Sequence, residues 1–245
     1  MTINGTDITE FDAKLKQWRV DQGDIDMDND SEWIRGTPLP VLFGSQVGFK
    51  DFTVTLMVYG SSRVDIQEKI GRILAALLEP AELVLDRYPH TFVGIMQKHK
   101  ITEHNDHSRD RFQTLELQFV GYVCDALTAT TFSGISTFEV TNPGNIISPL
   151  ILELTPTLGI AKTTITGICR DCESGEDLPV TIENLTTGKT IILDGTTGLI
   201  TEDGALKATD VDIWALPTIL PGVNKISVGT TYLNVTAKVL PLFLY

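Results

Sequence analysis

The chain has 245 residues, of which 42% are hydrophobic and 21% charged, and its formal net charge is −13 at pH 7. This length suffices for one large domain or two ordinary ones, and the composition is typical of a soluble globular protein. The negative charge argues against broad contact with nucleic acid, whose phosphates would be repelled. We also expect no signal peptide, no bilayer-spanning segment and, with three cysteines, no disulfide framework.

The N-terminal region predicts two strands on either side of an acidic tract. Residues 3–20 begin with a strand-turn signal, Ile3-Asn4-Gly5, and residues 49–58 alternate with apolar side chains on one face. Between them lie six carboxylates: Asp21, Asp24, Asp26, Asp28, Asp30 and Glu32. We expect the flanking strands to pair as a long hairpin with the acidic tract at its tip.

A helix is predicted after Ser61-Ser62. The Ser62 hydroxyl can cap the first amide hydrogens, Asp65 completes a short-armed capping box, and Pro80 stops the helix. An apolar stripe at helical spacing is best explained by core packing: Ile66, Ile70, Ile73, Leu74, Leu77 and Leu78. Residues 83–86 and 92–96 then predict a strand pair across a turn at 87–89, and residues 115–119 a further strand that ends near Cys124.

Residues 138–156, FEVTNPGNIISPLILELTP, predict two strands interrupted by Asn142-Pro143-Gly144, because proline fixes φ and glycine permits a tight turn. We interpret this stretch as the boundary between two domains, 1–138 and 139–245. The second domain has short β segments separated by turn signals and none with helical period, the pattern of an all-β sandwich or jelly roll. The expected segments are 163–168, 178–184, 190–194, 199–202, 224–228 and 233–240.

No stretch predicts catalytic chemistry. The run DIDMDND offers alternating carboxylates as a calcium loop does, but Asn29 and Arg35 stand where an EF-hand loop needs glycine and glutamate, so a solvated hairpin tip is favoured. His90, His99, His104 and His107 match no zinc spacing and are expected in exposed loops. Cys169 and Cys172 form a lone CxxC in a turn, either as free thiols or as a disulfide formed later in an oxidising medium. We therefore expect no enzyme activity, no cofactor and no metal site.

Several short motifs resemble the distal tail protein family of long-tailed phages that infect Gram-positive bacteria. They run nearly from end to end: ING at 3–5, GTPLP at 36–40, FTVTLMVYG at 52–60, LVLDRYPHTFVGIM at 83–96, FEVTNPGNIISPLILEL at 138–154 and LPTILPGVNKISV at 216–228. The resemblance implies a mainly β fold, with an α+β ring-forming domain (1–138) that carries one main helix, and a C-terminal galectin-like β-sandwich (139–245).

The resemblance also implies a structural role. Members of the family form a hexameric ring at the distal end of the tail tube, a hub that joins the tube to the tail-tip or baseplate and to the receptor-binding apparatus. A belt hairpin, here about residues 15–40, would embrace the neighbouring subunit. The expected belt interface comprises Trp18, Asp24, Asp26, Asp28, Asp30 and Trp33.

The expected partners are five other copies of the chain, the tail tube protein, the tail-tip or tail-associated lysin protein and a receptor-binding protein. DNA would pass through the ring without specific binding, and no membrane is involved. The protein of a phage or prophage would assemble in the host cytoplasm and reside in the virion, at the distal end of the tail.

A carbohydrate-binding module on an oligomerising N-terminal domain is the alternative. A sugar site needs an aromatic platform with converging polar groups. Residues 150–245 contain a single tryptophan, Trp214, with no histidine or arginine beside it. We interpret Trp214 as core or edge packing, so that the sandwich would be lectin-like in fold without lectin activity. A hydrolase of the host cell wall is the least favoured alternative.

Overall fold

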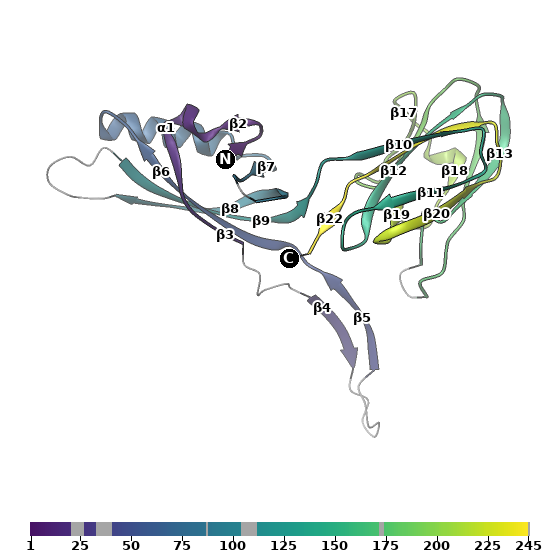
Figure 1. Cartoon of the computed structure of the whole chain (residues 1–245), viewed down its shortest axis with the longest axis horizontal. Helices are drawn as coiled ribbons and strands as arrows, with labels where there is room; N and C mark the ends of the chain where they lie inside the picture. The colour runs from purple at the N-terminus through teal and green to yellow at the C-terminus, as the bar shows by residue number, and fades with distance from the viewer. Residues whose placement is uncertain (21–26, 33–40, 87, 104–111, 172–173, 245) are drawn as a thin grey trace. The chain divides into compact units, whose positions relative to one another are not determined.

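The computed structural model describes residues 1–20, 27–32, 41–86, 88–103, 112–171 and 174–244, which form two compact units, Met1–Cys124 and Asp125–Leu244 (Figure 1). Both units consist mainly of β-strands. The units divide after Cys124, earlier than the boundary expected at residue 138, because strand β10 (Thr128–Ser133) pairs along its whole length with β21 (Leu233–Val239) near the end of the chain. The roles assigned to residues 1–138 and 139–245 stay predictions.

The first unit contains an antiparallel sheet with the strand order β2-β1-β7-β8-β9-β6-β3. Its strands are β1 (Thr2–Ile3), β2 (Thr6–Asp7), β3 (Ala13–Val20), β6 (Lys50–Tyr59), β7 (Ala81–Val84), β8 (Thr91–Glu103) and β9 (Phe112–Cys124). The pairing of β7 with β8 confirms the hairpin expected around residues 87–89. A 3-10 helix, η1 (Ile8–Phe11), precedes β3.

The helix α1 (Arg63–Ala75) lies against one face of this sheet (Figure 1). The sheet face is apolar because every second residue of β6 is buried: Phe52, Val54, Leu56 and Val58. The helix contributes Ile66, Ile70 and Ile73 to the same core. Ser62 caps it as predicted, but it ends at Ala75, before Pro80, and the last residue of the expected stripe, Leu78, is 78% exposed.

The described part of the acidic tract, residues 27–32, forms a strand and not the hairpin tip that was expected. Strands β3 and β6 do pair, which confirms that the segments flanking the tract come together. Between these two strands lies an excursion of the chain, residues 21–49. Within it, β4 (Met27–Glu32) pairs with β5 (Val41–Val47) as a separate two-stranded sheet. Asp28, Asp30 and Glu32 therefore belong to a strand, whose polar sequence has low intrinsic β-propensity and is extended by its pairing with β5.

The second unit is a β-sandwich with one core. One sheet has the order β10-β21-β12-β15-β16-β17, with β19 also paired to β12, and the other has the order β11-β20-β13-β14-β18. The two sheets enclose buried side chains from both, among them Leu150, Leu152 and Leu154 of β12 and Ile165, Ile182 and Ile226 of the opposite sheet.

The strands predicted in this unit are all present, with ends that differ by up to a few residues. They are β11 (Thr137–Asn142), β12 (Ser148–Pro156), β13 (Ile160–Thr166), β14 (Val180–Leu185), β15 (Ile191–Asp194), β16 (Ile200–Glu202), β20 (Gly222–Val228) and β21. Short elements complete the unit: β17 (Ala205–Leu206), η2 (Ala208–Asp210), β18 (Val211–Asp212), β19 (Thr218–Ile219) and β22 (Leu242–Phe243). No helix among the described residues of the chain is both long and apolar enough to cross a bilayer.

Candidate assembly surfaces

The excursion between β3 and β6, residues 21–49, is the first candidate surface. In β4, Asp28 is opposite Gln46 and Asp30 is opposite Gly44, and the register shifts after Asp30. Asp24, Asp26 and Trp33, which sequence analysis assigned to the same interface, lie outside the described residues. The structure thus gives two of the predicted carboxylates a position on a single strand. Their role in an interface stays a prediction.

Trp18 lies in β3, opposite Val54, and not in the β4–β5 hairpin. Its ring meets the ring of Tyr88 edge-on, with 5.4 Å between the centroids, and Tyr88 in turn contacts His90 edge-on. The side chain is 37% exposed. Trp18 is therefore partly buried within its own unit, and its expected place in the belt interface stays a prediction.

Lys50 lies at the base of the excursion and is unusual in its burial. Its side chain is 3% exposed, and its ammonium nitrogen has no hydrogen-bond partner among the described residues. Burial lowers the pKa of Lys50 below its ordinary value, because the charged form loses its hydration. The neighbouring Phe49 is 68% exposed.

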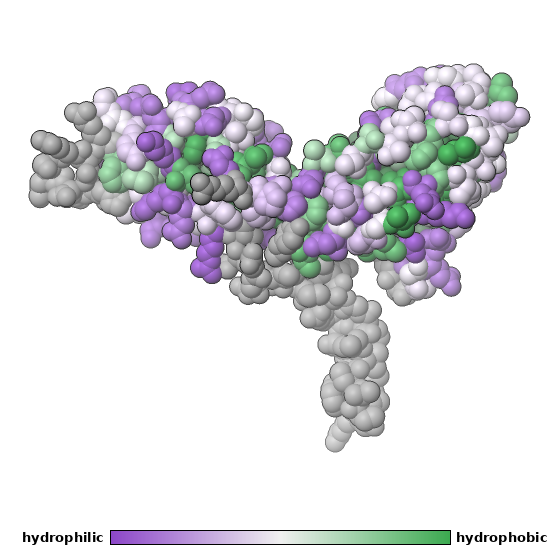
Figure 2. Space-filling view, in the orientation of Figure 1, coloured by the Kyte–Doolittle hydropathy of each residue, from purple (hydrophilic) through white to green (hydrophobic). Residues whose placement is uncertain are grey.

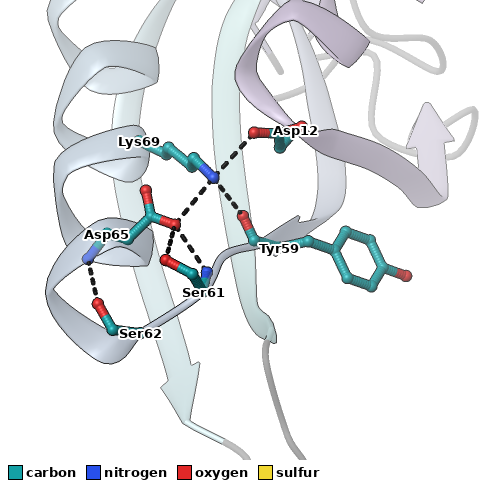
Figure 3. Close-up of polar contacts among 6 residues, drawn as sticks. All are labelled: Asp12, Tyr59, Ser61, Ser62, Asp65 and Lys69. Carbon is teal, nitrogen blue, oxygen red and sulfur yellow. Dashed lines mark hydrogen bonds and ion pairs between the residues drawn. The ribbon is translucent and has the colours of Figure 1, made fainter.

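A charged cluster holds α1 against the end of β6 and the start of β3 (Figure 3). The Lys69 ammonium contacts Asp12 at 2.8 Å and Asp65 at 3.1 Å, and it donates a hydrogen bond to the carbonyl of Tyr59 at 3.1 Å. Asp65 also accepts hydrogen bonds from the amide and hydroxyl of Ser61, at 2.7 and 3.0 Å. The hydrogen bond from the Ser61 backbone amide lowers the pKa of Asp65 most, and the hydrogen bond from Lys69 lowers it further. The three oxygens occupy the donors of the ammonium, so we interpret the cluster as structural.

Trp214 does not pack in the core or at a sheet edge, which corrects the sequence-based interpretation. Its side chain is 81% exposed. It lines a cavity of about 350 Å³ in the second unit, together with Leu193, Asp194, Gly198, Ile200, Ile213, Ala215, Leu216 and Pro217. We call this cavity the Trp214 pocket. The sequence offered no signal for it, because its walls come from two segments, 193–200 and 213–217, that are separate along the chain.

An apolar patch also lies on the second unit. Figure 2 shows apolar residues gathered on the visible face where β19 and β20 lie. Exposed side chains in and beside these strands are Leu220 and Val223, and Ile147 precedes β12, which pairs with β19.

The histidine and cysteine candidates that the structure describes form no metal site with one another. His99 lies in β8, whereas sequence analysis placed it in a loop, and His104 and His107 lie outside the described residues. Cys169 is a buried free thiol, and Cys172 lies outside the described residues. Among the residues that the structure describes, no group of three or more His, Cys, Asp or Glu could hold a metal ion.

Solved structures of phage tail proteins share the fold of the whole chain. Neither a protein-family model nor a curated protein sequence matches it. The Dit protein (gp 19.1) of phage SPP1, described as a paradigm of the hub adsorption apparatus in phages that infect Gram-positive bacteria, superposes with a TM-score of 0.74 at 11% identity, over 99% of this chain and 98% of that one. A chain of the phage P2 baseplate in its activated conformation with calcium matches with a TM-score of 0.52 at 9% identity, over 96% of this chain and 92% of that one. The same baseplate with strontium gives 0.50 at 8% identity. The chain therefore has the mainly β fold of Dit over both of its units.

Proposed function

We propose that this chain is a structural hub protein of a siphophage tail, at the distal end of the tail tube. The observation that carries the proposal is the likeness to SPP1 Dit, which extends over 99% of this chain and includes both units in their order along the sequence. A fold can host many functions, so the likeness alone supports the role by analogy. The short sequence motifs that resemble those of the distal tail protein family support the same role.

We further propose that six copies form a ring and that the excursion at residues 21–49 contacts the neighbouring copy. Strands β4 and β5 pair with each other and form no part of the main sheet, which leaves the hairpin available to a partner. A formal charge of −13 per chain suits a ring that DNA passes through, because acidic groups repel the phosphates and prevent binding. The ring would join the tail tube to the tail-tip and receptor-binding proteins.

The experiment is direct. The purified chain, alone and mixed with the tail tube protein of the same phage, is examined by light scattering and negative-stain electron microscopy. We expect ring-shaped particles with the mass of six copies, at least in the presence of the tube protein. A stable monomer under both conditions would exclude the proposed ring.

Carbohydrate recognition is the second candidate function, and the exposure of Trp214 favours it. Against it, polar side-chain atoms in the described lining of the Trp214 pocket are confined to the Trp214 indole N–H and the Asp194 carboxylate, part of whose acceptor capacity Thr196 and Thr197 already use. A sugar, which presents hydroxyls in several directions, would find few partners there. The structural hub is therefore the better-supported function.

A further inference from the structure

The segment that carries Trp214 is fixed at three points. The Cys169 thiol donates a hydrogen bond to the carbonyl of Ala215 at 3.1 Å. The Leu150 amide donates to the carbonyl of Pro217 at 3.0 Å, and the Thr218 amide donates to the carbonyl of Ile168 at 2.7 Å. The backbone at Gly195 lies so close to this segment that a Cβ on Gly195 would be 2.0 Å from the Pro217 carbonyl oxygen. Trp214 is thus a large aromatic side chain held in solvent on a rigid backbone.

A rigid exposed tryptophan suits binding more than folding. Its exposure gives the folded chain little hydrophobic stabilisation, whereas tryptophan is enriched among the residues that dominate binding energy at interfaces. Because the backbone is already ordered, a partner would lose little additional conformational entropy in this segment on binding. The geometry points to a preformed contact site.

Asp194 provides a fixed negative charge in the same pocket. Its Oδ1 accepts hydrogen bonds from the Thr196 amide and hydroxyl, at 2.8 and 2.6 Å, and from the Thr197 amide at 3.3 Å. Among the residues that the structure describes, its Oδ2 accepts one hydrogen bond, from the Thr197 hydroxyl at 2.8 Å, so that this oxygen retains capacity for another donor. Partial burial raises the pKa of Asp194, but these hydrogen bonds outweigh it and lower the pKa below its ordinary value, which keeps the carboxylate charged at neutral pH.

The remaining walls are apolar, and they select the kind of side chain that fits. Leu193, Ile200, Ile213, Leu216 and Pro217 line the pocket, and Leu216 is itself 55% exposed. A side chain with an apolar stem and a cationic planar end could place the stem against these walls. Its end could then stack on an indole and donate to a carboxylate, as an arginine guanidinium does in proteins.

The charge of the whole unit favours the same partner. Residues 125–245 contain 13 Asp and Glu side chains and 6 Lys and Arg side chains, a net charge of −7. Such a surface attracts basic segments and raises their rate of association. We propose that the Trp214 pocket binds an arginine side chain of a partner protein, stacked on Trp214 and paired with Asp194. Each residue of the site belongs to a single copy of the second unit, so the site does not depend on ring formation.

The test uses the full chain labelled with 5-fluorotryptophan, in which the fluorine signal of Trp214 is identified by its loss in Trp214→Phe. The probe is the peptide acetyl-Gly-Arg-Gly-amide. We expect a saturable shift of the Trp214 signal with a dissociation constant of about 1 mM, the range for one stacked and paired side chain. The same peptide with citrulline, which is neutral and nearly isosteric, should bind about tenfold more weakly or not at all, and added salt should weaken the arginine peptide.

Two variants and one sugar complete the design. Asp194→Asn, which keeps an acceptor for the turn, should weaken binding about tenfold, and Leu206→Ala, an exposed change in β17 outside the pocket, should not alter it. Thermal melting followed by circular dichroism reports whether the second unit of Asp194→Asn is folded, because the other two tryptophans, at positions 18 and 33, belong to the first unit; if it is not, the citrulline and salt comparisons decide. No saturable shift up to about 20 mM arginine peptide, a threshold set by the affinity expected of a single stacked ion pair, would overturn the proposal. Equal binding of the citrulline peptide, or a shift with chitotetraose alone, would also overturn it, the latter in favour of a glycan site.

Discussion

At the scale of single residues, Cys169 makes a testable link between burial and pH. Burial raises the pKa of its thiol to about 11 from an ordinary 9.0. Between these values the unfolded chain loses the proton and the folded chain keeps it, so the folded state loses stability as the pH rises through this window. Two pKa units at about 1.36 kcal/mol each set an upper limit of about 3 kcal/mol on this loss, and solvent screening reduces it.

Cys169→Ala should therefore be less stable than the parent at pH 7, by about 1–2 kcal/mol, because it loses buried volume and the hydrogen bond to Ala215. Its stability should fall less steeply than that of the parent between pH 9 and 11. Urea unfolding at pH 7, 9 and 11 measures both effects. Parallel pH curves for the two proteins would contradict the assigned pKa.

For Lys50 we expect the opposite pH dependence of the folding stability. Its folded-state pKa is lowered from 10.5 by burial, so the unfolded chain binds the proton more tightly and stability rises with pH from the lowered value up to about 10.5. Lys50→Met removes a buried ammonium that has no hydrogen-bond partner among the described residues, and it should raise stability at pH 7 by on the order of 1 kcal/mol. Thermal melting measures the change, with the exposed Lys189→Met as the matched variant that should melt like the parent. A lower melting temperature for Lys50→Met would show that the ammonium has a stabilising partner.

At the scale of elements, local signals predicted the strands and the helix well where one principle dominates. The alternation of β6 and β12 and the Ser62 cap of α1 are set by short-range physics, and the structure confirms them. The β4 strand was missed because MDNDSE extends only through its pairing with β5, a tertiary effect that its composition opposes. The Trp214 pocket was missed for a related reason, since it depends on the approach of segments 193–200 and 213–217.

The N-cap of α1, Ser62, allows a test of how much the cap stabilises the helix. The Ser62 hydroxyl accepts a hydrogen bond from the Asp65 amide at 3.2 Å. Ser62→Ala should destabilise the first unit by about 1 kcal/mol, because the amide loses this acceptor, whereas Ser62→Gly should cost only a few tenths. Urea unfolding followed by the fluorescence of Trp18, which lies in the same unit, measures the difference. Equal effects of the two substitutions would mean that the cap does not stabilise α1.

At the scale of the whole molecule, the boundary between the two units is set by a strand pairing between residues that are far apart in the sequence. Residues 125–137 precede the stretch that changes composition, yet β10 pairs with β21, about one hundred residues later, and so belongs to the second unit. Phe132 of β10 also stacks on Phe138 of β11, with 4.3 Å between ring centroids. This contact packs β10 against the sandwich. A fragment of the second unit should therefore begin at Asp125, because one that begins at residue 139 would lack a strand.

The excursion at residues 21–49 offers the test of assembly that is most separable from folding. Replacing residues 21–47 with a short Gly-Ser linker keeps β3 and β6, whose last pair, Val20 and Phe52, can be joined by a tight turn. Because β4 and β5 pair with each other and not with the main sheet, the first unit should keep its circular dichroism spectrum and melt within a few degrees of the parent. If the excursion contacts a neighbouring copy, the ring should be lost, as judged by light scattering and electron microscopy.

The matched variant for this deletion is Asp28→Asn with Asp30→Asn, which keeps both strands and removes two charges. It should still form rings if the excursion acts through its shape and backbone pairing, and it should lose them if the carboxylates carry the contact. Trp18→Ala is less diagnostic, because Trp18 also packs on Tyr88 and its loss should lower the melting temperature of the unit itself. Rings that persist after the deletion would exclude residues 21–47 as the contact between copies, and the search would then move to the sheet of the first unit.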